Sequence, residues 1–560
     1  MAVKIPPSDL VFPNLNEDRA EIRILEVQPG SQGSNIQCKF NVVTLDNLES
    51  PYETLSYTWG DENEATKVTV WLDETPVPVS RNLFDALKKL RMTHEPRRLW
   101  VDALCINQAD NVEKTWQVSM MHRIYSQCQQ CAIWLGALED VDVFHARAAV
   151  DTLCWFAGSR GKPDWMDDDS ARDYAAKALK ILINLPWWGR IWTVQEAILP
   201  SSATVYWGPC DISWDLMRRA ADSFFDNPSR EIPGEFWAHG GAIDLQSAMR
   251  GLQFTSRESL FQVLWRWRFR QATDPRDKVY GLVGFRRDTS LPTVKTCDYK
   301  IDVRTLYQRV TADLIRLSTD LQPLIGRGGE VSEIPGLASW AVDWHGVRDD
   351  SRRSTVNFWD HHRRWHGLGY TADRGLRGVG QGLKVEDDRI LYLHGLQIDR
   401  ICAVEDRSKG TCVEDYGSAG SLFLTSGGRW GRVITQFQEQ YPGQLPDNWM
   451  SAFLGLITGK LIPQDPNHGD GIDDWMKNMV RPQALFITES GRFGLGPRSI
   501  QPGQEVWVLG GSRFPVILNH RAGGADEEGF TFAGECFVYG VMRGEAVEGR
   551  SDEQREIKLY

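Results

Sequence analysis

A short aromatic run contains one arginine and one glutamate, residue types that can act on a sugar or a developing cation. It spans residues 186–197 and reads PWWGRIWTVQEA. If the run is helical, Trp192 and Glu196 are four residues apart and share a face, while Arg190 lies about 160° round from Trp192. An aromatic wall strips water from a neighbouring carboxylate, which suits a catalytic group. The pattern therefore predicts a catalytic role for Glu196.

The same run also fits a purely structural role. In that interpretation the tryptophans belong to the core, and Glu196 lies at its edge in an ion pair with Arg190. Composition alone favours this interpretation, because ion-paired carboxylates are common at protein surfaces. Both interpretations stay open on these residues alone.

Polar and aromatic residues follow two other strand-like runs, at residues 53–60 and 99–106. A charge inside an apolar strand is costly unless it has a partner, so Asp102 must contact either a ligand or the loop at Asn107. Asn107 itself suits either capping of the next helix or contact with a ligand. We expect six residues of these runs to line a ligand site, although each aromatic is more often core than contact: Tyr57, Trp59, Gly60, Asp102, Asn107 and Gln108.

The elements that position these residues alternate between strand and helix. Residues 99–106 and 131–136 are apolar runs typical of buried parallel strands, and residues 113–129 carry a helical stripe between them. A strand, a crossover helix and a strand form a βαβ unit with parallel strands. With further strands at 53–60 and 203–208, the pattern predicts a doubly wound α/β sheet, whose ligands bind at the carboxyl ends of the strands.

The domain organisation is predicted from the same patterns. Residues 1–44 form a β hairpin region, and residues 45–215 form the α/β domain with a helical insertion at 137–185. Residues 216–345 form a helical segment packed on that domain, with a clear amphipathic helix at 306–317. Residues 346–560 form a mixed region that contains helical pieces near 430–441 and 449–458. It ends in short strands with Gly turns, which predict a small β barrel or sandwich.

Composition excludes several function classes. The chain has 560 residues, a formal net charge of −12 and ten cysteines. An acidic chain with no concentrated basic face is not expected to bind nucleic acid. No export signal or membrane span is expected, so the predicted location is the cytoplasm, where ten cysteines do not form a disulfide scaffold. His361, His362 and His366 lie among arginines, and we expect no metal site there.

Several sequence blocks resemble one known family. Residues 55–60 (LSYTWG), 99–108 (LWVDALCINQ), 134–136 (WLG) and 187–196 match blocks of the fungal heterokaryon incompatibility (HET) domain in order and wording. The resemblance covers residues 45–215, and residues 272–282, 335–344 and 534–545 resemble segments that accompany the domain in long members. It implies a fungal protein of self/non-self recognition, which triggers cell death when incompatible hyphae fuse.

A more distant likeness bears on chemistry. The order of strands and helices, ending in Trp192 and Glu196 as Trp-x-x-x-Glu, is similar to the flavodoxin-like TIR domain, in which the corresponding glutamate is essential for cleaving the nicotinamide–ribose bond of NAD. The likeness implies that Glu196 is catalytic, that Trp192 walls in the sugar ring and that Arg190 binds the pyrophosphate. It implies NAD as a substrate, no required cofactor, and self-association into a homo-oligomer on activation. The alternative is a non-enzymatic signalling module that docks an unknown protein partner through the same sheet.

Overall fold

A computed structural model describes residues 10–31, 33–60, 67–138, 140–226, 234–238, 245, 248–249, 252, 258–285, 291–325, 332–345, 369–380, 383–405, 429–458, 483–521 and 528–560. The chain divides into two compact units. Unit 1 comprises residues 1–290, 294–300 and 347–355, and unit 2 comprises residues 291–293, 301–346 and 356–560. The helical segment predicted at 216–345 is therefore shared between the two units. The predicted loop with His361, His362 and His366 lies outside the described residues.

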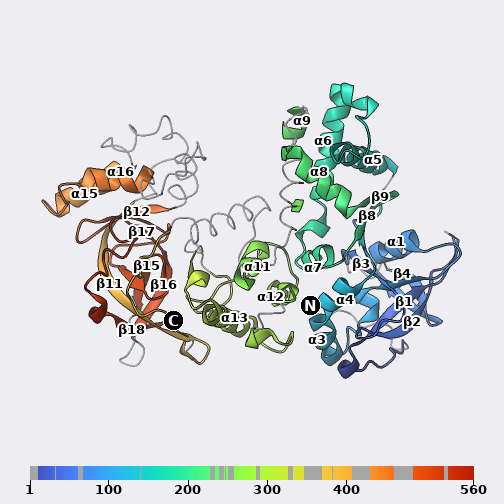
Figure 1. The fold of residues 1–560 in the computed structure, drawn as a ribbon, viewed down its shortest axis with the longest axis horizontal. Coiled ribbons are helices and arrows are strands. Elements are labelled where there is room, and N and C mark those ends of the chain that lie inside the picture. The colour runs from blue at the N-terminus through green and yellow to red at the C-terminus, as the bar shows by residue number, and fades with distance from the viewer. Residues whose placement is uncertain are drawn as a thin grey trace. The chain divides into compact units, whose positions relative to one another are not determined.

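Unit 1 is built on one mixed sheet, to which the strands labelled β1 to β4, β8 and β9 in Figure 1 belong. Its strands follow the order β5-β4-β2-β1-β6-β3-β7-β8-β9. Four neighbouring strands, β6, β3, β7 and β8, run parallel to one another, whereas β1 and β9 pair antiparallel at either side of them. The strand bounds are β1 Glu21–Val27, β2 Gln37–Thr44, β3 Glu53–Tyr57, β4 Val68–Leu72, β5 Thr75–Val79, β6 Arg97–Trp100, β7 Cys131–Trp134, β8 Ala203–Trp207 and β9 Cys210–Ser213.

The hairpin predicted at the N-terminus is part of this sheet. β1 and β2 pair antiparallel over their whole length, and β1 also pairs with β6. The predicted α/β architecture is confirmed as a mixed α/β fold with a parallel centre. The crossover from β6 to β7 passes over β3, which lies between them, because β3 pairs with both.

The apolar run at 99–106 is a strand only as far as Trp100. Val101 is the N-cap of a helical turn, α2 (Asp102–Cys105), so the prediction that Asp102 lies inside a strand was wrong. Periodicity alone cannot separate a buried strand from a buried helical turn in a continuous apolar run. The helix predicted at 113–129 is likewise two helices, α3 (Asn111–Ser119) and α4 (Met121–Gln127), which are separated at Met120.

Helices begin in this unit where the sequence supplies caps. The hydroxyl of Ser80 accepts a hydrogen bond from the backbone N–H of Leu83 at the start of α1 (Arg81–Leu90), and Asp110 caps α3 in the same way. The predicted insertion at 137–185 contains two helices, of which the second is capped by Asp168. The remaining helices of unit 1 are α5 Asp140–Phe156, α6 Asp169–Ile183, α7 Thr193–Ile198, α8 Trp214–Asp226, α9 Gly234–Ala238, α11 Leu260–Trp267 and α12 Asp277–Val283.

Unit 2 contains a closed β barrel. The long strand β11 (Ile390–Val404) pairs with β18 along its first part, with β14 in its middle and with β12 at its end. The strands β14, β15, β16 and β18 follow one another and return to β11, which closes the sheet. The other strands are β10 Val385–Glu386, β12 Ala484–Thr488, β13 Phe493–Gly496, β14 Glu505–Leu509, β15 Val516–Arg521, β16 Gly529–Glu535, β17 Phe537–Val538 and β18 Arg555–Leu559.

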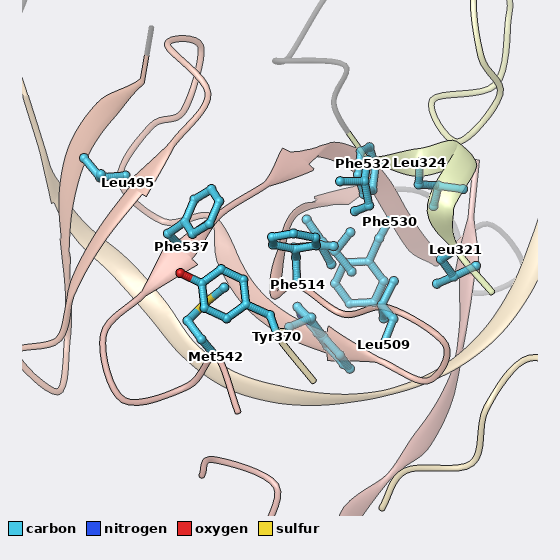
Figure 2. Packing of buried hydrophobic residues seen from close by; sticks show 14 of the residues in the cluster. Leu321, Leu324, Tyr370, Leu495, Leu509, Phe514, Phe530, Phe532, Phe537 and Met542 are labelled. Atoms are coloured by element: carbon cyan, nitrogen blue, oxygen red, sulfur yellow. The ribbon is translucent and has the colours of Figure 1, made fainter. Parts of the chain in front are cut away.

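Aromatic side chains fill the core of unit 2. Tyr370, Phe514 and Phe537 meet edge to face, with ring centroids 5.5–5.9 Å apart (Figure 2). Such edge-to-face packing is favourable beyond the area that it buries.

The predicted β-rich C-terminal region is present in unit 2. Its helical pieces are α15 (Arg429–Gln440) and α16 (Trp449–Thr458), and the amphipathic helix predicted at 306–317 is α13 (Val303–Ser318). None of the described helices has the length and apolar character that a membrane crossing requires.

A buried ion pair joins β1, the first strand of unit 1, to the first turn of α3. Arg23 of β1 is 1% exposed, and its two terminal nitrogens donate to the two carboxylate oxygens of Glu113 at 2.6 and 2.8 Å. The same guanidinium donates to the carbonyl oxygen of Cys105, and the backbone N–H of Asn107 donates to Glu113. This pair therefore fixes the chain immediately after α2.

Replacing Glu113 by Gln removes the carboxylate that balances the buried charge of Arg23, which keeps only carbonyl oxygens as partners. We expect this variant to lower the free energy of unfolding of unit 1 by about 3–5 kcal/mol, since breaking a buried pair strands the remaining charge. Chemical denaturation of the full chain measures the loss. Asp151→Asn, which removes an exposed pair with Arg160, is the control and is expected to cost less than about 1 kcal/mol. Similar small losses in both variants would contradict this account of the pair.

Candidate functional site

The segment that carries Glu196 is not one continuous helix. Residues Pro186–Gly189 form a 3₁₀ turn, Arg190 is extended with φ −82° and ψ 142°, and α7 begins at Thr193 with Trp192 as its N-cap. The expectation of a continuous helix through Arg190 was therefore wrong. The proline at the start and the glycine at 189 explain why the chain turns tightly and then straightens. The break at Arg190 directs its side chain independently of α7.

Glu196 lies inside unit 1 and is 4% exposed. Helix α7 packs against β3 and β7, the inner two of the four parallel strands. Its carboxylate accepts a hydrogen bond from the hydroxyl of Ser56 on β3, and that hydroxyl oxygen accepts one from the indole N–H of Trp187 at 2.8 Å. Three residues from two segments thus form one buried chain of hydrogen bonds, which runs from Trp187 through Ser56 to Glu196.

The environment of Glu196 disfavours its charge, and the pKa of its carboxyl is raised to about 7. Burial is the largest cause of this rise, and the nearby carboxyl of Asp102 also acts to raise the pKa. Two groups act in the opposite direction, the positive charge of Arg190 and the hydrogen bond from Ser56. The net result is a buried carboxyl that exchanges its proton near neutral pH, as a general base or an electrostatic stabiliser must do.

Arg190 does not form the ion pair with Glu196 that the structural interpretation expected. Its guanidinium donates to the carbonyl oxygen of Tyr57 at the end of β3, and within the described residues no ion pair joins it to a carboxylate. Its charge nevertheless lowers the pKa of both Glu196 and Asp102. Arg190 therefore acts on two carboxyls through space while its own hydrogen bond fixes it to the strand end.

Asp102 lies beside the same strand end and is surrounded by donors. The indole N–H of Trp59 donates to one carboxylate oxygen at 2.9 Å, and the backbone N–H of Ala103 donates to the other at 2.7 Å. The hydroxyl of Tyr57 also bonds this carboxylate, and burial raises the pKa of that hydroxyl well above its ordinary value. Burial likewise raises the pKa of Asp102 against the lowering by Arg190 and these donors. Asp102 is thus partnered by Tyr57 and Trp59.

The carboxyl ends of β3 and β7 are joined by a residue of α1. The amide nitrogen of Asn82 donates to the carbonyl oxygen of Thr58 at 2.7 Å, and its amide oxygen accepts from the indole of Trp134 at 2.8 Å. Gly60, with φ +80°, follows directly and lies exposed, in a backbone conformation that favours glycine. Sequence reasoning missed Asn82, Ser56 and Trp187. The signal available was polar residues in or beside an apolar run, which must be hydrogen-bonded when buried.

Three of the predicted site residues form hydrogen bonds to other parts of the chain or contact the site only through its backbone. The indole of Trp192, the N-cap of α7, bonds the carboxyl of Asp277 on α12, and its predicted role of walling in the sugar ring stays a prediction. The side-chain oxygen of Asn107 accepts from the N–H of Ala109 at 3.2 Å, which makes it a loop stabiliser. Gln108 donates to the backbone carbonyl oxygen of Asp102 at 3.0 Å and so contacts the site only through the backbone.

The arrangement brings together Glu196, Asp102, Arg190, Tyr57, Trp59 and Gly60 near the carboxyl end of β3. Two carboxyls beside one guanidinium can attract a cationic group and accept hydrogen bonds from hydroxyl groups. Among the described residues, no cluster of three or more histidine, cysteine, aspartate or glutamate side chains has a geometry that holds a metal ion. Whether the assembled residues bind a ligand stays a prediction.

Comparison with known proteins points to one family in each unit. Residues 52–196 match the family model described as heterokaryon incompatibility protein (HET), and residues 466–559 match the Het-6 beta-barrel domain. Both matches make the chain similar to heterokaryon incompatibility proteins. The chain is 23% identical to heterokaryon incompatibility protein 6, OR allele, of Neurospora crassa, in an alignment that covers 95% of both chains. No solved structure matches the chain significantly.

The raised pKa of Glu196 makes the stability of unit 1 depend on pH. The folded state holds the proton up to about pH 7, whereas the unfolded carboxyl releases it near its ordinary pKa of 4.5. The contribution of this group is therefore full below pH 4.5 and is lost as pH rises through 7. Between pH 4.5 and 8, the free energy of unfolding of Glu196→Gln should therefore rise by about 3 kcal/mol relative to that of the wild type.

Thermal and denaturant unfolding at each pH measures this gain. Glu26→Gln is the matched control, since Glu26 is a half-buried carboxylate of the same sheet whose side chain accepts from Asn41. Its unfolding curves should shift in parallel with those of the wild type. If Glu196→Gln also runs parallel to the wild type, the proposed burial of an ionisable carboxyl is wrong.

Proposed function

We propose that this chain is a fungal self/non-self recognition protein that triggers cell death, and that unit 1 does so by cleaving the nicotinamide–ribose bond of NAD. The HET and Het-6 matches and the similarity to heterokaryon incompatibility protein 6 support the first part. The observation that carries the second part is Glu196, a buried carboxyl with a pKa near 7 behind the carboxyl end of β3.

The topology supports a ligand site at this place. The four parallel strands, numbered by their order in the chain, are arranged second, first, third, fourth. Flavodoxin-like doubly wound sheets share that order in their first four strands, and they bind ligands where the direction of winding changes. In unit 1 that point lies between the ends of β3 and β7, which Asn82 bridges. A TIR-like relationship of this domain is therefore part of the proposal.

The chemistry requires little beyond a well-placed carboxylate. Nicotinamide leaves the ribose as a neutral molecule, so no acid is needed to protonate it. The sugar that remains carries positive charge, which the carboxylate of Glu196 stabilises while it accepts hydrogen bonds from the ribose hydroxyls. Ser56 holds that carboxylate in one rotamer, and Arg190 lowers its pKa so that it is ionised above neutral pH.

A closed resting state accounts for the burial of Glu196. At 4% exposure, its carboxylate reaches a substrate only after α7 or the end of β3 moves. Self-association is the activating event that we propose, because contacts between copies can supply the free energy for such a movement. The resting protein would then not cleave cellular NAD until recognition occurs.

A non-enzymatic docking module is the second candidate. The specific observation in its favour is that the groups around Glu196 and Asp102 satisfy one another, with Ser56, Trp59 and Tyr57 as partners. In that case the hydrogen-bonded cluster only fixes the sheet, and an unknown protein partner binds its surface. Cell killing would then survive Glu196→Gln and fail after surface substitutions.

Nicotinamide release from NAD tests the enzymatic proposal. Purified full-length protein, assayed alone and after forced clustering, should release nicotinamide with a rate that rises with pH through about 7, following ionisation of Glu196. Glu196→Gln should lower the rate about 100-fold or more, whereas Glu26→Gln should not. Equal rates in Glu196→Gln and wild type exclude Glu196, and an absence of release in every oligomeric state rejects NAD cleavage.

Ser56→Ala separates a role of the hydroxyl in catalysis from a role in folding alone. Because the hydrogen bond from Ser56 lowers the pKa of Glu196, its loss should move the midpoint of the pH–rate profile to higher pH. The limiting rate at high pH should fall much less than in Glu196→Gln. A lower rate with an unchanged midpoint would show that Ser56 only supports the fold.

A further inference from the structure

Arg270 is a buried cation beside the segment that carries Glu196. It lies between α11 and α12 and is 4% exposed. One of its terminal nitrogens donates to the hydroxyl of Thr193 at 2.9 Å and to the carbonyl oxygen of Arg190 at 3.2 Å. Its Nε atom is buried and has no hydrogen-bond partner among the residues that the structure describes. Arg270 therefore retains unused donor capacity in the interior of unit 1.

The charge of Arg270 is also uncompensated, unlike that of its neighbours in the chain. Arg266 pairs with Glu258 at 2.5 Å, and Arg276 pairs with Asp274 at 2.7 Å. Within the described residues Arg270 forms no ion pair, and burial lowers its pKa to about 9. Burying a guanidinium without an anion costs several kcal/mol, so an unpaired buried arginine calls for an explanation.

The surroundings of Arg270 add positive charge. The ammonium group of Lys278, which is 3% exposed, donates to the carbonyl oxygens of Arg268 and Arg270. Two buried cations thus lie close together in the chain, Arg270 on the short stretch after α11 and Lys278 in the first turn of α12. The stretch after α11 pairs with the residues between the 3₁₀ turn Pro186–Gly189 and α7, since the N–H of Ile191 donates to the carbonyl oxygen of Gln271 at 2.9 Å. The positive charge is consequently attached to the same chain segment as Glu196.

We propose that Arg270 anchors an anion site that takes a phosphate group. A guanidinium presents its donors in a planar fork that matches phosphate oxygens, and a phosphate supplies the missing negative charge. The hydroxyl of Thr193 donates to the carbonyl oxygen of Arg190 at 2.7 Å and accepts from Arg270, so it holds the guanidinium in place, and Lys278 adds a second buried cation. Because Thr193 precedes Glu196 by less than one turn of α7, a ligand held here lies next to the candidate catalytic carboxyl. Assigning this phosphate to the diphosphate of NAD rests on the proposed function.

A structural role for Arg270 makes different predictions from an anion site. If Arg270 only ties Thr193 and Arg190 together, anions do not affect the wild type and loss of the guanidinium destabilises the fold. If Arg270 belongs to an anion site, its unpaired charge lowers the stability of the fold when no anion is bound. In phosphate-free buffer Arg270→Gln should then be at least as stable as the wild type.

Thermal unfolding of the full chain with inorganic pyrophosphate tests the site, with sodium chloride at matched ionic strength as the reference. The melting temperature of the wild type should rise saturably with pyrophosphate, and Arg270→Gln should abolish the rise. Arg266→Gln is the matched control, because Arg266 is a neighbouring arginine with its own carboxylate, and it should respond like the wild type. No rise in the wild type, or an equal rise in Arg270→Gln, overturns the proposal.

Arg270→Lys decides the question if Arg270→Gln does not fold. Lysine keeps the charge but loses the planar fork, so pyrophosphate should bind about tenfold more weakly. Unchanged affinity overturns the site. Inorganic phosphate and ADP-ribose identify the source of the phosphate group, since tighter binding of ADP-ribose than of pyrophosphate indicates a nucleotide ligand.

The outcomes for the anion site and for NAD cleavage are distinguishable. Pyrophosphate stabilisation that depends on Arg270, without nicotinamide release in any oligomeric state, keeps the anion site and rejects the enzyme. Nicotinamide release by a wild type that does not respond to pyrophosphate rejects the anion site alone. The two measurements use different ligands and different readouts, so neither failure hides the other.

Discussion

The hydrogen bond from Ser56 to Glu196 is the interaction on which the candidate site depends. It joins the parallel strand β3 to α7 and places an ionisable carboxyl where water is excluded. A carboxyl in such a place either loses its charge or requires nearby donors and cations, and here both effects operate. Burial raises the pKa of Glu196, whereas the charge of Arg190 and the hydrogen bond from Ser56 lower it, so the pKa is about 7. The titration near neutrality follows from this balance.

Further polar contacts hold the rest of unit 1 around that carboxyl. Asp102, Tyr57 and Trp59 form a second cluster at the same strand end, and the Arg23–Glu113 pair fixes the chain just after it. On the far side of α7, the indole of Trp192 bonds Asp277, whose pKa burial raises to about 6. Each contact commits a polar group that would otherwise be buried without a partner, so the region is rigid by necessity. Any ligand must compete with these internal bonds.

Much of the architecture could be predicted from residue patterns. The alternating elements of unit 1 and the short C-terminal strands are strongly periodic, and both the mixed α/β sheet and the closed barrel are present. The position of Glu196 was not predicted in the same detail, since the structural interpretation placed it at the edge of the core, whereas it is 4% exposed. The predictions that were wrong concern local structure. In the run at 99–106 the strand ends at Trp100, and in the run at 186–197 the predicted helix is interrupted at Arg190. Continuous apolar runs and short aromatic segments carry no period that identifies such breaks.

The sequence by itself determined the element types, the cluster of chemically able residues and the resemblance to the HET family, since all three depend on residue order alone. Only the tertiary structure decided the partners. It paired Ser56 with Glu196 across 140 positions, directed Trp192 to Asp277, and left Arg270 buried beside Thr193. Such pairings depend on which strands become neighbours and on how each side chain satisfies its hydrogen bonds once water is removed. Neither condition is local in the chain, so neither is visible in residue spacing.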